Sequence, residues 1–187
     1  MHIVVNRVDY FNAALTVLST DGFGGLKITR LCKSLKVTSG SFYGYFGSLA
    51  GFVDEFLDHW EATQTDRIAA VLSAEPDPVL RVHALKEMAA DLPHDAEASI
   101  RSWGNVNEKV KAVVRRVDER RQQVIFELVE PIVGPDRAYA LAVVGMTMLV
   151  GLQQWHRPVA RPDYELVFNE FEDLIIASAS TGVQLPE

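Results

Sequence analysis

The stretch TSGSFYGYFGS, residues 38–48, combines hydroxyl side chains, glycines and aromatic rings without a single charged residue. Its hydroxyl groups can donate hydrogen bonds to phosphate oxygens or to base edges, while its aromatic rings can anchor the segment in a core. Glycine costs about 1 kcal/mol relative to alanine inside a helix, so Gly40 and Gly44 indicate that packing, not helix propensity, holds the segment. On composition alone, a glycine-softened loop between core helices is an alternative.

Basic residues gather near the start of the chain, although the net charge of the whole chain is -7. Residues 1–50 contain five basic and two acidic residues, a net charge of +3, which leaves -10 for the remaining residues. A basic head on an acidic body predicts that a polyanion, if one binds, contacts the head.

Other functional classes have little support in the sequence. The five histidines are scattered, with no HExxH motif, and no nucleophile elbow, phosphate loop or dinucleotide fingerprint occurs. We therefore expect no catalytic residue, no metal site and no cofactor. The only cysteine, Cys32, cannot form an intrachain disulfide, and no secretory signal is evident, so we expect a cytoplasmic protein. The apolar run from Ala138 to Trp155 predicts a buried helix and not a membrane span.

Apolar residues recur at helical spacing along the whole chain, and no strand-like alternation stands out. The sequence therefore predicts an all-α fold of about nine helices. The helical segments that we expect are 11–18, 28–35, 39–46 after an N-cap at Thr38, 49–72 after an N-cap at Ser48, 79–92, 94–103, 106–130, 138–155 and 164–175.

Three short helices followed by longer ones, with the segments AAL, DGF and GSFYGYFGS in that order, resemble the TetR (tetracycline-repressor) family over residues 8–60. The resemblance implies a helix-turn-helix DNA-binding domain at residues 1–47 and a helical regulatory domain, for ligand binding and dimerisation, at residues 48–187. It implies that residues 39–46 form the recognition helix. The candidate DNA-binding residues are Lys27, Thr29, Arg30, Thr38, Ser39, Gly40, Ser41, Tyr43, Gly44 and Tyr45.

Three positions depart from the family pattern. Leu49 stands where a phosphate-binding lysine usually opens the fourth helix, and Lys27 stands where a Ser or Thr usually caps the second. Lys36 replaces a turn glycine, so a left-handed backbone there would carry a steric cost. These departures bear on the strength of DNA binding and not on the architecture.

The resemblance also implies a repressor, released from a palindromic double-stranded operator by a small-molecule effector of unknown identity. Six large residues are candidate ligand contacts, although ordinary core packing is an alternative for each: Met88, Trp103, Phe126, Tyr139, Met146 and Trp155. The last two helices are expected to form a homodimer interface through Leu141, Gly145, Met148, Leu152, Phe168, Phe171 and Ile175. The alternative function is a helical adaptor or ligand-binding protein with weak or no DNA affinity.

Overall fold

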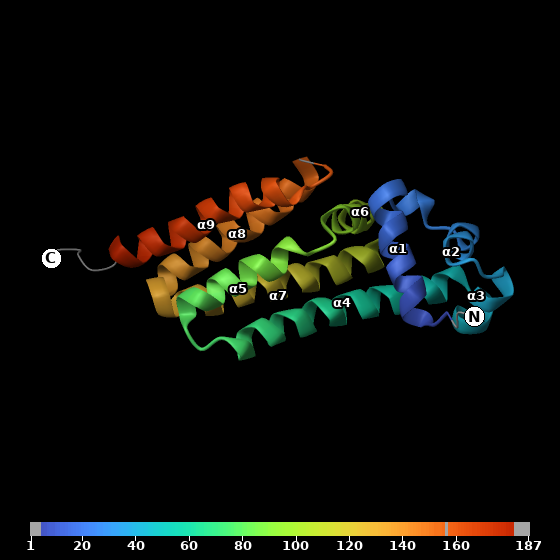
Figure 1. Cartoon of the computed structure of the whole chain (residues 1–187), viewed down its shortest axis with the longest axis horizontal. Helices are drawn as coiled ribbons and strands as arrows, with labels where there is room; N and C mark the ends of the chain where they lie inside the picture. Colours follow the sequence, from blue (N-terminus) through green and yellow to red (C-terminus); the bar gives the residue numbers. More distant parts are fainter. Residues whose placement is uncertain (1–4, 156, 182–187) are drawn as a thin grey trace. The chain divides into compact units, whose positions relative to one another are not determined.

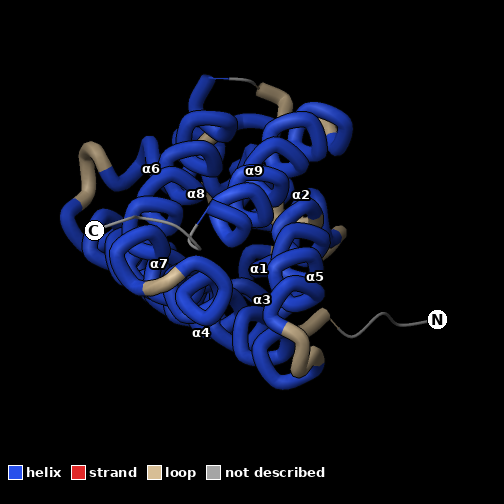
Figure 2. Tube along the Cα trace, turned by 90° about the vertical axis from the view of Figure 1, so that its left-hand side faces the viewer, coloured by secondary structure: helices blue, strands red, loops and turns tan. Residues whose placement is uncertain are grey.

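The computed structural model describes residues 5–155 and 157–181, and this part of the chain contains helices and no strand, as predicted (Figures 1 and 2). The α-helices also match the predicted number over these residues. In chain order the elements are α1 Arg7–Asp21, the short 3-10 turn η1 Phe23–Gly25, α2 Ile28–Leu35, α3 Ser39–Phe46, α4 Leu49–Ala74, α5 Pro78–Ala90, α6 His94–Gly104, α7 Glu108–Val133, α8 Pro135–Trp155 and α9 Arg161–Thr181.

Capping side chains and a glycine fix the ends of the helices near the start of the chain. Asn6 and Asp9 form a reciprocal capping box at the start of α1, and Gly22, with a φ of 68°, ends that helix. Thr38 caps α3 by accepting a hydrogen bond from the Ser41 N–H, and Ser48 accepts from the Gly51 N–H at 3.0 Å. Residues 39–46 are therefore a capped helix and not a loop.

The described chain divides into two units. The first comprises the chain up to Thr63 together with Pro93–Val114, and the second comprises Gln64–Leu92 and the chain from Arg115. The helices α4 and α7 contribute residues to both.

An aromatic core holds the first unit together. Phe42 and Phe46, one turn apart on α3, are 0% and 7% exposed, and both pack their rings against Tyr10 of α1. Tyr10 and Phe42 meet edge to face, with 5.7 Å between ring centroids. Burial of each such ring contributes about 1.5–3 kcal/mol, which offsets the poor helix propensity of the glycines in α3.

The first unit is larger than the predicted three-helix head. Helix α1 packs against α6 as well as α2, and the rings of Phe23 and Trp103 stack with 6.2 Å between centroids. The functional division at residue 47 remains a prediction.

The second unit is built around α8. By length and composition alone this helix could cross a membrane, but one side of it lies in the core against α7 and α9, as the sequence predicted. The residues of α8 buried there are Ala138, Leu141, Ala142, Gly145, Met146, Leu149, Leu152 and Gln153.

The residues predicted for the dimer interface mostly lie inside this core. Leu141, Leu152, Phe168, Phe171 and Ile175 are all buried within the single chain, and Met148 packs partly buried against the same cluster. Gly145 is small because the Phe171 ring occupies the space beside it: a Cβ there would lie 2.7 Å from the ring. The predicted stripe is therefore an intramolecular packing face.

Candidate DNA-binding surface and ligand cavity

Helix α3 presents a thin, exposed face on the side away from the aromatic core. Ser39, Gly40 and Gly44 are exposed, and the Tyr43 side chain is 52% exposed. A Cβ at Gly44 would meet no atom within 4 Å, so this part of α3 is open to an approaching surface. A helix with small side chains on one face can bring its backbone close to the floor of a major groove about 12 Å wide.

Two of the predicted DNA-binding residues, Ser41 and Tyr45, use their hydroxyl groups in hydrogen bonds within the head. The Tyr10 hydroxyl donates to Ser41 Oγ at 3.1 Å, and the Tyr45 hydroxyl donates to the Val5 carbonyl at 2.7 Å. Burial raises the pKa of Tyr10, so its hydroxyl keeps the proton that it donates. In this structure Tyr45 ties the start of the chain to α3, a use that the sequence did not indicate.

The basic candidates lie around the start of α2. Lys27, Thr29 and Arg30 are exposed and line a shallow depression together with Lys33, which the sequence analysis did not single out. Arg30 pairs with Asp21 at 2.8 Å, so part of its charge is compensated within the head. Lys33 could have been found from its position one turn after Arg30 on the exposed side of α2.

Two of the departures from the family pattern have visible consequences. Lys36 follows α2 with a φ of 56° and a ψ of 41°, the left-handed conformation expected at that position, and its N–H donates to the Lys33 carbonyl at 3.3 Å. Lys27 occupies the N-cap of α2 and its side chain makes no capping hydrogen bond. Lys36 therefore strains the turn between α2 and α3, and Lys27 leaves the start of α2 without a side-chain cap.

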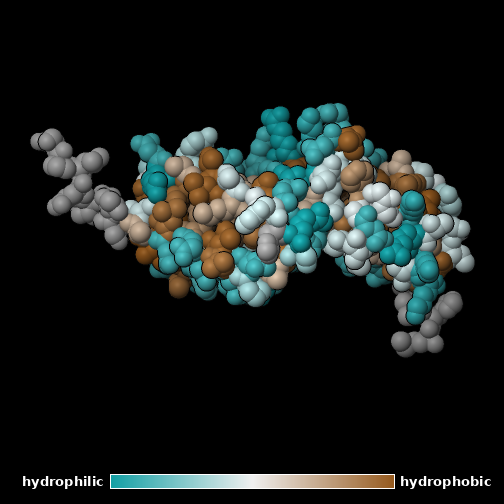
Figure 3. Space-filling model, turned by 90° about the horizontal axis from the view of Figure 1, so that it is seen from above, coloured by the Kyte–Doolittle hydropathy of each residue, from teal (hydrophilic) through white to brown (hydrophobic). Residues whose placement is uncertain are grey.

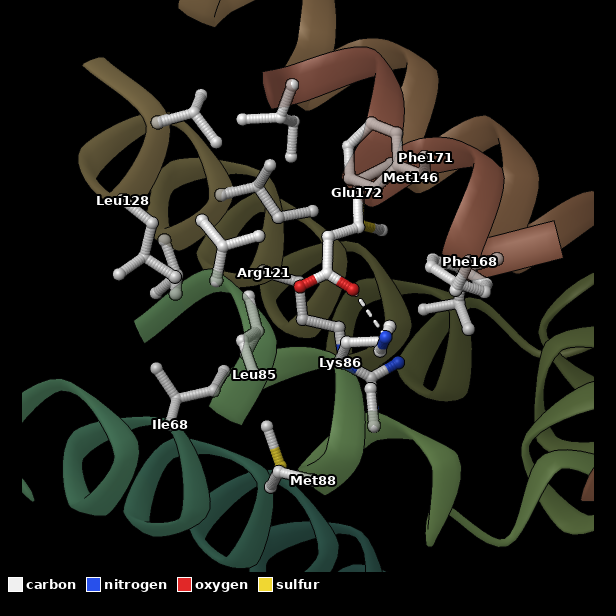
Figure 4. Close-up of a pocket in the computed structure, with 18 of the residues that line it drawn as sticks. Ile68, Leu85, Lys86, Met88, Arg121, Leu128, Met146, Phe168, Phe171 and Glu172 are labelled. Carbon is white, nitrogen blue, oxygen red and sulfur yellow. Dashed lines mark hydrogen bonds and ion pairs between the residues drawn. The ribbon is translucent and has the colours of Figure 1, made fainter. Parts of the chain in front are cut away.

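The second unit contains a partly open cavity of about 80 Å³ between the end of α4 and helices α5, α7, α8 and α9 (Figure 4). Almost all of the surface that faces the cavity is apolar, and Ile68, Leu85, Leu128, Phe168 and Phe171 contribute to it. A single water needs roughly 10–15 Å³, so the cavity has room for several water molecules or for the apolar end of a small molecule.

Charged side chains interrupt the apolar lining. The Lys86 ammonium of α5 pairs with the Glu172 carboxylate of α9, as the dashed line in Figure 4 shows, and also donates to Asn169 Oδ1 at 3.0 Å. Burial raises the pKa of Glu172, but its contacts with Lys86 and His83 outweigh burial and hold that pKa below its ordinary value. Arg121, also buried, donates to Gln64 Oε1 at 2.9 Å.

Comparison with known families decides the nature of the head. Residues 11–56 match the sequence model of the bacterial regulatory proteins of the tetR family. The chain is a TetR-family regulator. It is therefore a DNA-binding transcriptional regulator, and the family match favours this function over a helical adaptor without DNA affinity.

Solved structures share the fold of this TetR-family regulator over most of its length. A TetR-family regulator from Streptomyces coelicolor has 16% sequence identity and a TM-score of 0.75, with 95% of this chain and 96% of that chain covered. One from Agrobacterium tumefaciens has the same identity and TM-score, covering 90% and 96%. A transcriptional regulator from Saccharomonospora viridis, in complex with choline, has 17% identity and a TM-score of 0.72, covering 89% and 95%. A comparison with curated proteins gave no match.

Of the six predicted ligand contacts, the structure of this TetR-family regulator brings only Met88 and Met146 to the cavity. Phe126 and Tyr139 border a separate depression between α7 and α8, Trp103 stacks on Phe23, and Trp155 is 86% exposed. Size and apolarity selected these residues, and neither property reveals which side of a helix faces the cavity. Within residues 5–155 and 157–181, no three His, Cys, Asp or Glu side chains gather in a way that could hold a metal ion.

Proposed function

We propose that this TetR-family regulator represses transcription as a homodimer on a two-fold symmetric operator, and that a small molecule in the cavity of the second unit releases it. The cavity carries the proposal, because a space of about 80 Å³ inside a packed helical core leaves apolar surface without partners. Support comes from the regulator from Saccharomonospora viridis, which shares the fold and is in complex with choline. Regulators of this family are soluble cytoplasmic proteins, and we propose the same location here.

We propose that α3 enters the major groove with its thin face. Ser39 and Tyr43 then offer hydroxyls to phosphates, while Gly40 and Gly44 allow the backbone to approach the base edges. Lys27, Thr29 and Arg30 around the start of α2 and Lys33 in its last turn would contact the flanking phosphates, as would Thr38 and Ser41 around α3. These basic residues make the affinity fall with salt, as counterions are released from the DNA on binding.

We propose that the dimer forms through the outer faces of α8 and α9, and not through the residues first predicted. Apolar side chains remain exposed there: Tyr139 is 63% and Val143 41% exposed on α8, and Leu166 is 71% and Ile176 46% exposed on α9. Figure 3 looks onto these C-terminal helices and shows apolar surface between polar residues. Burial of such a face against its symmetry mate would place two heads on the two halves of one operator.

Selection of bound duplexes from a random DNA library tests the DNA-binding part. We expect the enriched sequences to have two-fold symmetry, and affinity for them to fall steeply as the salt concentration rises. Enrichment of sequences without symmetry, or affinity that does not depend on salt, would contradict the proposal. Adding candidate effectors to the complex with the selected duplex then tests release.

The substitution Leu166→Glu tests the dimer face. Because Leu166 is 71% exposed in the single chain, the protomer should keep its fold, while a charge inside an apolar interface should shift the protein to monomer in sedimentation experiments. Val106→Glu is the matched control, since Val106 is 74% exposed at the turn between α6 and α7 and should leave the dimer intact. A dimer that survives Leu166→Glu would rule out this face.

A further inference from the structure

We propose that Tyr10 of α1 is a positioning residue for operator binding, because it holds the Ser41 hydroxyl of α3 as a hydrogen-bond donor to a DNA phosphate. Tyr10 is 0% exposed and so does not itself reach the DNA, but its hydroxyl lies 3.1 Å from Ser41 Oγ. Ser41 contacts DNA only if α3 enters the major groove, so this role rests on the function proposed above.

Ser41 lies at the border between the core side and the exposed side of α3. It is partly buried, whereas Gly40 and Gly44 are exposed. At 3.6 residues per turn, Ser41 and Tyr43 stand roughly 160° apart around the helix, on opposite flanks of the face that carries the two glycines. When that face meets the floor of the groove, the flanks face the sugar–phosphate backbones of the two strands. The Ser41 hydroxyl is therefore placed to meet a phosphate.

Burial determines which of the two hydroxyls donates the hydrogen bond. Among the described residues the Tyr10 hydroxyl has no other hydrogen-bond partner, so its proton would be buried unpaired if Tyr10 accepted from Ser41. Tyr10 therefore donates and Ser41 Oγ accepts. The Ser41 side chain makes no second hydrogen bond to the described part of the chain, so its own O–H remains available. Phosphate oxygens, which only accept, match this donor.

The aromatic core fixes the Tyr10 ring beneath Ser41. The ring meets Phe42 and Phe46 edge to face, with 5.7 Å and 5.3 Å between centroids. Burial raises the pKa of Tyr10, so its hydroxyl stays protonated and keeps donating. Without this partner, the Ser41 hydroxyl can rotate or donate to a backbone carbonyl of the preceding turn, and either state competes with a phosphate contact. Tyr10 thus pre-organises Ser41 for the DNA.

The variants Tyr10→Phe and Ser41→Ala, alone and together, test this role through operator affinity measured by fluorescence anisotropy. Ser41→Ala should lower the affinity roughly tenfold per head, since a hydrogen bond to a charged group is worth that factor or more. Tyr10→Phe should lower it about threefold or more, and should have no further effect in the Ser41→Ala background, where the hydroxyl that it positions is gone. Additive losses would show that Tyr10 supports only the fold of the head, and would overturn the proposal.

Tyr45→Phe is the matched control. The Tyr45 hydroxyl also donates a hydrogen bond within the first unit, at 2.7 Å, but to the Val5 carbonyl and not to Ser41. Its effect on operator affinity should therefore add to that of Ser41→Ala. Circular dichroism melts establish that each variant is folded, as expected for Tyr10→Phe because it keeps the ring and its aromatic contacts.

Replacement of single operator phosphates by neutral methylphosphonate groups locates the contact. One position in each half-site should cost the wild-type protein roughly tenfold in affinity and should cost both Ser41→Ala and Tyr10→Phe less, because the donor is absent or misplaced. Tyr45→Phe should keep the wild-type sensitivity at that position. A scan in which no phosphate depends on both Ser41 and Tyr10 would overturn the proposal.

The same measurements separate this role from the function proposed above. If Ser41→Ala and Tyr10→Phe leave the affinity unchanged while Tyr43→Phe and Gly44→Leu lower it, α3 enters the groove without a Ser41 contact, and only the positioning role is overturned. If all four variants bind like the wild-type protein, the placement of α3 in the groove and the positioning role are both overturned.

Discussion

Replacement of Lys36 by glycine should stabilise the protein. Lys36 adopts a φ of 56° and a ψ of 41°, and a residue with a Cβ is less stable by about 1–2 kcal/mol in this left-handed region. Glycine avoids that strain, but it loses about 0.5–1 kcal/mol more conformational entropy on folding. The Lys36 side chain is exposed, so its removal takes little packing away. The net gain is roughly 1 kcal/mol, which corresponds to a rise in Tm of about 2–4 °C for a chain of this size.

Lys36→Gln is the matched control for this experiment, because it removes the charge and keeps the strain. Thermal unfolding followed by circular dichroism should place Lys36→Gln within about 0.5 kcal/mol of the wild-type protein and Lys36→Gly above both. If Lys36 contacts a phosphate, both variants should lower the salt dependence of operator binding by about one unit, because both lose the same charge. Equal Tm values for the glycine and glutamine variants would refute the argument from backbone strain.

Two further predictions address the head and the cavity wall. Tyr43→Phe should lower operator affinity roughly tenfold per head at unchanged Tm, because it removes only an exposed hydroxyl. Gly44→Leu should lower operator affinity more. Its Tm should hold or rise, because leucine favours the helix and no atom lies within 4 Å of the new Cβ. Fluorescence anisotropy with the selected operator measures both, and wild-type affinity in the two variants would remove α3 from the DNA interface. Glu172 has a lowered pKa in the folded protein, so its contribution to stability is present above the ordinary glutamate pKa and is lost as the pH falls through the lowered one. The Tm difference between wild type and Glu172→Gln should therefore shrink on acidification, and a difference independent of pH would contradict this.

The helices could be predicted from the sequence because their signals are local. The segment 28–35 was predicted from apolar spacing alone and is α2 in the structure, and Thr38 was predicted to cap the following helix and does so. Each signal involves residues within one or two turns of each other, so neither required knowledge of the tertiary fold.

The packing of α8 and α9 could not be predicted in the same way. Both helices carry apolar residues on more than one face, and the residue types that fill a core also fill an interface. Leu141 and Phe171 were therefore predicted to contact a second subunit, whereas the structure buries them within the chain and leaves Tyr139 and Leu166 exposed. Only the contacts between α5, α7, α8 and α9 decide which face is inside.

The charged wall of the cavity had a sequence signal that was overlooked. Phe168, Phe171, Glu172 and Ile175 follow the i, i+3, i+4, i+7 spacing of a single buried face, so Glu172 stands at an inward position. Arg121 likewise lies four residues after the buried Val117 on α7. A charged residue at an inward position needs a buried partner, and that rule points to the cavity better than aromatic size did.

Gly145 and Gly44 differ in the space beside them. At Gly145 a Cβ would lie 2.7 Å from the Phe171 ring, so the packing of α8 against α9 explains the absence of a side chain. At Gly44 a Cβ would meet nothing within 4 Å, and almost any other residue would favour the helix by up to about 1 kcal/mol. The stability of the head therefore gives no reason for glycine at position 44. We propose that the reason is close approach of the α3 backbone to the floor of the DNA major groove.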